Sequence, residues 1–171
     1  MLLAASGQPG RGLRQGFGQG QSGGDDTLSL CYIDEKKGLG VRALVDCKEN
    51  EAIHHFTGTI KAEIEQHSLQ IWQDKHICGT EYIGFLSHSC APNCRLDMDG
   101  FRLVTLSDIR ANDVLTIDYA ATEDRLFCQF SCHCGAPQCR GWITGRREPV
   151  NRQGKTYLET LNRDGRNAPE I

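Results

Sequence analysis

The segment FLSHSCAPN at residues 85–93 decides how this chain is interpreted, together with two blocks that follow it in order. The second block, LTIDY at residues 115–119, is an apolar run that ends in an acid and a tyrosine. The third block contains Cys132, Cys134 and Cys139, with glycines nearby. Each block alone is a weak signal, but the three in this order indicate one site assembled from distant parts of the chain.

Length and composition favour one folded domain with polar ends. The chain has 171 residues, of which 39% are hydrophobic and 24% charged, so it can bury one ordinary core but is too short for two full domains. Its formal net charge of -3 provides no basic field for sequence-independent contacts with nucleic acid phosphates. We therefore expect no direct binding to nucleic acid.

The first residues predict an intracellular protein, cytoplasmic or nuclear, that is not secreted. Residues 1–6, MLLAAS, lack a charged start and are followed by Gly and Gln, so they indicate neither a secretory signal peptide nor a membrane span. In a reducing compartment, nine cysteines are expected as metal ligands and buried thiols rather than as disulfides.

The local pattern is that of many short strands with little helix. Residues 7–26 are rich in Gly and Gln and poor in aliphatic side chains, which predicts a flexible leader. Strands are predicted at residues 28–33, 41–45, 53–60, 101–106 and 114–119, with turns at 98–101 and 111–113. The segment 63–75 fits neither the helical nor the strand period. Beyond residue 145 the chain is polar, with helix-like spacing at Tyr157, Leu158 and Leu161.

The cysteine spacing of the third block indicates a metal site. Cys132-x-Cys134-x4-Cys139 supplies three thiols at a spacing typical of tetrahedral zinc, which needs one further ligand. Free thiols or a redox pair are the alternatives. Cys94 and Cys128 lie close enough in sequence to compete for the metal.

The three blocks together resemble the signature of SET-domain protein lysine methyltransferases: an Asn-His-Ser-Cys-x-Pro-Asn stretch, a strand ending in Asp-Tyr, and a cysteine-rich post-SET tail. The resemblance covers roughly residues 30–145. It implies a mainly β fold, in which small curved sheets with few short helices surround a chain threading called the pseudoknot. The corresponding division is a leader at 1–27, a SET domain at 28–123, a zinc-binding post-SET segment at 124–145 and a polar tail at 146–171.

The same resemblance implies S-adenosylmethionine as the cofactor. Gly38, Leu39 and Gly40, which by themselves indicate only a turn between strands, match the family's Gly-x-Gly turn, where glycines let the backbone approach the methionine part closely. Ser87 and His88 stand where the family has Asn and His. Serine reaches less far than asparagine and can lose a cofactor contact of about 0.5–1.5 kcal/mol. Trp142 is expected to cover the adenine or to line the lysine channel.

Tyr119 is the catalytic residue that the resemblance implies. The reaction moves a methyl group from a sulfonium to a neutral lysine amine, and desolvation beside a positive sulfonium lowers the pKa of lysine from near 10.4. A tyrosine hydroxyl would orient the amine, with positioning supplying most of the rate. Phe56 and Ile117 are the expected residues of the substrate pocket. Because Ile117 is smaller than the family's Phe or Tyr, we expect higher methylation states as products.

The family comparison also completes the zinc site, because post-SET domains take their fourth ligand from the position of Cys90. The expected function is therefore that of a protein lysine N-methyltransferase acting on a lysine-bearing protein, with a histone as one candidate. Ser87 and Phe56 motivate an alternative, a SET-like module that is catalytically weak or inactive and binds cofactor or a protein partner. A second alternative is a zinc-stabilised interaction domain in which Tyr119 belongs to the core.

Overall fold

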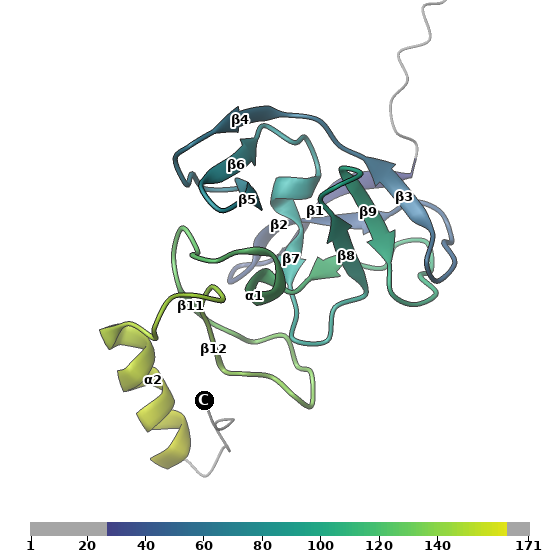
Figure 1. The fold of residues 1–171 in the computed structure, drawn as a ribbon. Helices are drawn as coiled ribbons and strands as arrows, with labels where there is room; N and C mark the ends of the chain where they lie inside the picture. Colours follow the sequence, from purple (N-terminus) through teal and green to yellow (C-terminus); the bar gives the residue numbers. More distant parts are fainter. Residues whose placement is uncertain (1–26, 164–171) are drawn as a thin grey trace, which may run out of the picture.

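The computed structural model describes residues 27–163, which form small sheets and few helices (Figure 1). The leader expected at residues 1–27 lies almost wholly outside the described residues. Four of the five sheets in the described residues are antiparallel. The first pairs β1 (Leu28–Asp34) with β2 (Gly38–Ala43). The second has the order β3 (Ala52–His55), β9 (Arg102–Thr105), β8 (Cys94–Asp97), and the third the order β4 (Thr59–Lys61), β6 (Lys75–Cys78), β5 (Leu69–Trp72). The fourth is a pair of short strands near the C-terminal helix. This mainly β architecture confirms the expected fold class.

A parallel pair of two short strands brings the first two signature blocks together. In this pair β7 (Ser87–His88) lies beside β10 (Thr116–Ile117), with Ser87 opposite Thr116. The side chain of Asn93 donates to the carbonyl of Val114 at 2.9 Å and accepts from the backbone N–H of Thr116 at 2.8 Å. A signature residue thus fixes the register between segments that are far apart in sequence.

The remaining elements follow the second block. They are the helix α1 (Tyr119–Thr122), the antiparallel pair β11 (Phe130–Ser131) and β12 (Trp142–Ile143), and the C-terminal helix α2 (Arg152–Arg163); a 3-10 turn, Ile83–Phe85, precedes β7. Figure 1 shows α2 beside the β11–β12 segment, on the opposite side of the molecule from β3 and β4. None of the helices in residues 27–163 is long and apolar enough to cross a membrane.

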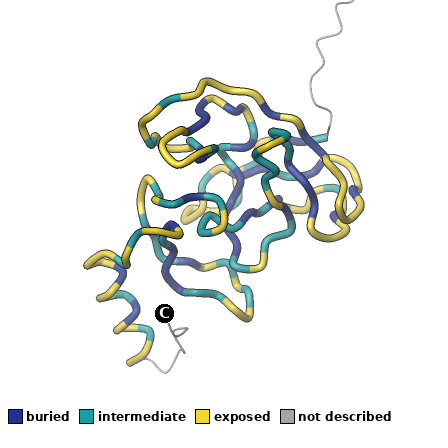
Figure 2. The backbone as a smooth tube through the Cα atoms, viewed as in Figure 1, coloured by how far each residue is buried: buried dark blue, intermediate teal, exposed yellow. Residues whose placement is uncertain are grey.

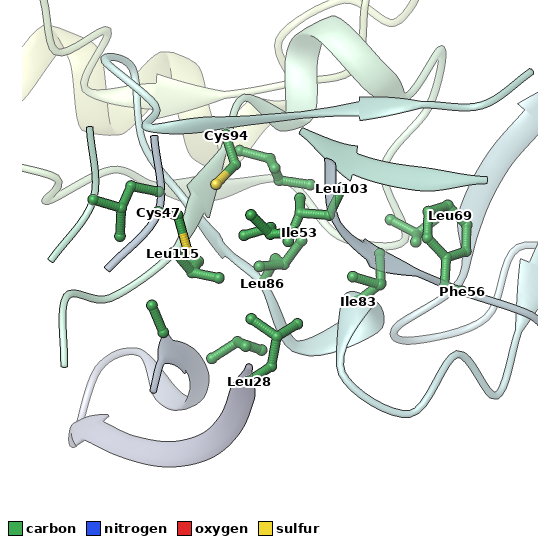
Figure 3. Packing of buried hydrophobic residues seen from close by; sticks show 14 of the residues in the cluster. Leu28, Cys47, Ile53, Phe56, Leu69, Ile83, Leu86, Cys94, Leu103 and Leu115 are labelled. Carbon is green, nitrogen blue, oxygen red and sulfur yellow. The ribbon is translucent and has the colours of Figure 1, made fainter. Parts of the chain in front are cut away.

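The hydrophobic core contains side chains from strands of several sheets, among them β1, β9 and β10. Figure 3 shows buried side chains from many elements in this cluster, among them Leu28, Ile83, Leu103 and Leu115, each at most 2% exposed. In Figure 2 the exposed backbone gathers in the loops and at the outer strands.

The structure refines three local expectations. The strand expected at 53–60, interrupted by a glycine, consists of two strands, β3 and β4, with Gly58 between them; a Cβ at Gly58 would lie 2.4 Å from the carbonyl oxygen of Cys78. The ambiguous segment 63–75 contains the strand β5 and no helix. The strand expected at 114–119 is shorter, because the side chain of Asp118 accepts from the N–H of Ala120 and caps α1.

Candidate active site and metal centre

The four cysteines expected to bind zinc lie together. The Sγ atoms of Cys90, Cys132, Cys134 and Cys139 are all within 4.8 Å of one another, and those of Cys90 and Cys132 are 3.9 Å apart. Zinc–sulfur bonds of about 2.3 Å in a tetrahedron place sulfur atoms about 3.8 Å apart, so the cluster fits a zinc ion. Hydrogen bonds from backbone N–H groups to sulfur reinforce it, at 3.5 Å from Cys90 to Cys134 and at 3.4 Å from Arg140 to Cys90.

The two competing cysteines lie outside this cluster. Cys94 is 1% exposed in the hydrophobic core, and burial raises the pKa of its thiol to about 12. Cys128 is exposed. Within the cluster, burial acts to raise the pKa of Cys134, but backbone N–H groups of Cys90 and Ala136 and the neighbouring thiols together lower it to about 6. The arrangement therefore favours a thiolate at Cys134, whereas burial raises the pKa of Cys90 and Cys132; the thiolate is the form that ligates metal.

Two cavities meet at Tyr119. Cavity I, of about 220 Å³, is lined by residues that include Ile117, Glu123 and Phe127. Cavity II, of about 260 Å³, is lined by residues that include Lys37, Leu39, Ser87, His88 and the segment 132–134. The residues that line both cavities are His67, Gly84, Leu86, Tyr119 and Phe130.

Tyr119 is held firmly between these cavities. Its hydroxyl donates to the carbonyl of Leu86 at 2.5 Å, and its backbone N–H donates to Nδ1 of His88 at 3.2 Å. The ring packs edge-on against those of His88 and Phe130, with centroids 5.3 and 5.9 Å away. Burial, with a smaller contribution from the charge of Glu123, raises the pKa of Tyr119 to about 12. The phenol therefore stays protonated at neutral pH and acts as a donor and dipole rather than as a base.

His88 connects Tyr119 with the cysteine cluster. Burial lowers the pKa of its imidazole to about 4, so the ring is neutral at physiological pH. Since Nδ1 accepts the N–H of Tyr119, the proton resides on Nε2, which lies 3.4 Å from Sγ of Cys90. One side chain of the signature thus contacts both the metal cluster and the backbone of the candidate catalytic tyrosine.

The glycine turn lies beside cavity II, and of its three residues only Leu39 lines the cavity. Gly38 has a φ of 68°, in the left-handed region that favours glycine. At Gly40 a Cβ would lie 2.3 Å from Cδ1 of Ile33 and 3.1 Å from Oγ of Ser87. Glycine at this position therefore lets β2 approach the Ser87 side chain, while Leu39 lines the cavity itself.

Two expected site residues lie elsewhere. Phe56 is 3% exposed in the core, edge-on to Phe101 at 5.8 Å, and lines neither cavity I nor cavity II. Trp142 also lines neither cavity: its Nε1 donates to Oε1 of Gln129 at 3.0 Å, and its ring packs against α2. The reason is the helix α2, which covers Trp142 and whose Gly154 leaves room for the indole.

The sequence interpretation did not include several residues that shape the site. Phe130 lines both cavities and separates them together with Tyr119. Arg140 forms a close ion pair with Asp118, the residue that caps α1. Glu123 is a buried carboxyl at the wall of cavity I. Two positions in the sequence could have indicated the ion pair. Arg140 directly follows Cys139, and Asp118 directly precedes Tyr119.

Known proteins are similar to this chain in sequence. The family model described as "SET domain" matches residues 38–120. Histone-lysine N-methyltransferase ASHH2 of Arabidopsis thaliana is 29% identical over 140 residues, covering 68% of this chain and 8% of the relative. The H3 lysine-36 specific histone-lysine N-methyltransferase of Schizosaccharomyces pombe is 30% identical over 142 residues, covering 68% of this chain and 18% of the relative.

Solved structures agree. KRYPTONITE in complex with mCHH DNA, H3(1-15) peptide and SAH superposes with a TM-score of 0.53 and 25% identity, over 67% of this chain and 29% of that one. The chain thus spans less than a third of the length of each protein named in this comparison. The matched model, the parallel pairing of the signature blocks and the shared fold identify residues 38–120 of this chain as a SET domain.

Proposed function

We propose that this chain is an S-adenosylmethionine-dependent protein-lysine N-methyltransferase, with the cofactor in cavity II and the acceptor lysine in cavity I. The observation that carries the proposal is the meeting of the two cavities at Tyr119, Leu86 and Phe130. A methyl transfer between two large substrates needs this geometry, because the reacting atoms must meet while the substrates approach from different sides.

Cavity II offers suitable groups for the cofactor. When bound, S-adenosylmethionine supplies an electrophilic methyl group on a sulfonium. Leu39, Ser87 and His88 line the cavity, and the ammonium groups of Lys36 and Lys37 are available to its anionic carboxylate. The buried Ser87 presents a hydroxyl where the family has an amide, and this shorter side chain can lose one contact with the cofactor. KRYPTONITE, which shares the fold, has been solved with SAH.

Cavity I suits a lysine side chain. Its wall includes the buried apolar Ile83, Leu86 and Ile117, which exclude water around an aliphatic stem, together with carboxyl groups that favour a cation. The hydroxyl of Tyr119, fixed by the carbonyl of Leu86, can orient the reacting groups at the junction. Desolvation at this position lowers the pKa of the lysine and favours the neutral amine that attacks the methyl carbon.

A histone is the substrate that we propose first, and the nucleus is the corresponding location. The relatives from Arabidopsis thaliana and Schizosaccharomyces pombe are named as histone-lysine methyltransferases, the second as specific for H3 lysine 36. The expectation of no direct nucleic-acid binding stays a prediction, since the KRYPTONITE structure contains DNA and peptide.

One experiment separates activity from the alternative of a binding module. The protein is incubated with radiolabelled S-adenosylmethionine and either histone H3 or cell extract, and calorimetry measures cofactor affinity. We expect a labelled lysine and cofactor binding in the micromolar range. Cofactor binding without label on any protein would favour the inactive module that Ser87 motivated, and no binding at all would favour a structural zinc domain.

A further inference from the structure

We propose that Glu123 binds the acceptor ammonium in cavity I and takes its proton before methyl transfer. This inference rests on the proposed function and adds a catalytic residue to it. Glu123 follows α1 directly, and its backbone N–H donates to the carbonyl of Tyr119 at 2.9 Å. One turn of helix therefore links the candidate base to the residue at the junction of the cavities.

The carboxyl group of Glu123 is buried but sparsely partnered. The residue is 7% exposed and lines cavity I. Both carboxylate oxygens accept from the backbone N–H of Gln70, at 3.0 and 3.1 Å, and the side chain of Thr122 also interacts with the carboxyl group. A carboxylate has about four acceptor positions, so capacity remains for a further donor.

No cationic side chain within residues 27–163 forms an ion pair with Glu123. The nearby Arg146 instead pairs with Asp124 at 3.0 Å and donates to the carbonyl of Ala121 at 3.2 Å. Burying an ionised carboxylate without a counterion is costly. An ammonium group that enters cavity I would supply the missing partner.

The electrostatic surroundings suit proton exchange near neutral pH. Burial raises the pKa of Glu123 to about 7; the N–H of Gln70, the charge of Arg146 and the side chain of Thr122 oppose this shift, while Asp124 acts in the same direction as burial. The titratable or charged groups around it are Tyr119 on α1, Asp124 and Arg146 beside it, and Glu65 and His67 across the cavity. A base that titrates near the working pH is the most effective proton acceptor.

The proton balance of the step is simple. The lysine ammonium loses one proton to the carboxylate, which becomes a neutral carboxyl group. The amine lone pair then forms a bond to the methyl carbon, and the carbon–sulfur bond breaks with its electrons remaining on sulfur. The product is a methylated ammonium, and Glu123 releases its proton to solvent before the next cycle.

A structural role alone would not need a charge. The contact with Gln70 ties α1 to β5, but an amide oxygen could accept that N–H equally well. Glu123→Gln therefore keeps the shape and this hydrogen bond while it removes the charge and the proton acceptor. Asp97→Asn is the matched control, because Asp97 is a half-buried carboxylate paired with Arg102 that lines neither cavity.

The test measures methylation of histone H3 as a function of pH, together with cofactor affinity. We expect Glu123→Gln to lower kcat by about tenfold or more at neutral pH, and to recover as the pH approaches about 10, where solvent removes the lysine proton. Cofactor affinity should stay unchanged in both variants. A native pH profile in Glu123→Gln, or a loss of equal size at every pH, would overturn the inference while the methyltransferase function stands.

A second measurement does not depend on the choice of histone. The probe is n-butylammonium, which mimics the end of a lysine side chain, and NMR follows its binding in the presence of SAH. We expect the native protein to bind it about tenfold more tightly than Glu123→Gln, a difference of about 1.4 kcal/mol. If the native protein binds n-butylammonium more tightly than Glu123→Gln but histone H3 is not labelled, the role of Glu123 is supported and only histone H3 is refuted as the substrate. Equal binding by both proteins would refute the inference.

Discussion

Replacing one ligand of the cysteine cluster should disorder the post-SET segment and weaken cofactor binding, while leaving the core sheets folded. The perturbation is Cys139→Ser, which removes one of the four thiols that lie within 4.8 Å of one another. The reason for a local effect is that cavity II takes part of its wall from residues 132–134, whereas β3, β8 and β9 make no use of the cluster.

The expected size of the effect follows from what else holds this segment. Between Phe130 and Ile143 the main apolar anchors are Trp142 and Ile143, whose burial contributes roughly 5–8 kcal/mol. Ordering a segment of about 14 residues costs about 14–28 kcal/mol. The apolar anchors therefore leave a shortfall of about 6–23 kcal/mol, and a structural zinc site contributes about 10–16 kcal/mol, which is of the same size. We therefore expect the segment to lose its order when the metal is lost.

The assay combines metal analysis, hydrogen exchange and calorimetry. We expect about one zinc per native chain, and in Cys139→Ser a loss of zinc, fast amide exchange over residues 128–145 and at least a tenfold weaker affinity for S-adenosylmethionine, with β8 and β9 still protected. Cys128→Ser is the control for zinc content, because this exposed thiol lies outside the cluster. Native protection of the segment in metal-free protein would refute the reasoning.

Three further predictions concern the cavities. Tyr119→Phe removes the hydroxyl that donates to Leu86, and we expect transfer to fall about 10²-fold while calorimetry finds cofactor affinity retained. Because the pKa of Glu123 rises from 4.5 to about 7 on folding, its contribution to stability is fully present below about pH 4.5 and is lost as the pH rises through about 7. In urea unfolding, Glu123→Gln should therefore gain roughly 3 kcal/mol relative to the native protein between these pH values, and a difference that is constant with pH would contradict this. Since Ile117 leaves the wall of cavity I free of a bulky aromatic at its position, mass spectrometry should find di- and trimethylated lysine, and monomethyl product alone after exhaustive reaction would contradict this prediction.

The sequence predicted the parts of the site that short motifs encode. The segment 85–93 and the run 115–119 lie side by side because Asn93 bonds to the backbone of Val114 and Thr116, so one motif residue records a tertiary contact. The cysteine spacing was likewise informative, because a tetrahedral metal site requires its ligands to be separated by short loops. Such patterns are visible because each is fixed by a specific chemical group.

The remaining parts depend on long-range packing that no local pattern encodes. The sequence around Trp142 does not distinguish a contact with the cofactor from a contact with α2. Its position in the structure depends on the helix that covers it. Glu123 looks like an ordinary exposed acid until β5 buries it. The position of Phe56 also depends on long-range packing, because its contact with Phe101 places it in the core.

Two separate paths connect the cysteine cluster with Tyr119. In one, Sγ of Cys90 contacts His88, whose Nδ1 accepts the backbone N–H of Tyr119. In the other, Arg140 donates its N–H to Cys90 and forms an ion pair with Asp118, which caps the helix that Tyr119 begins. Both paths end on the backbone of α1 rather than on the tyrosine hydroxyl. The cluster can therefore set the position of the helix, and with it the junction of the two cavities, without touching the groups that react.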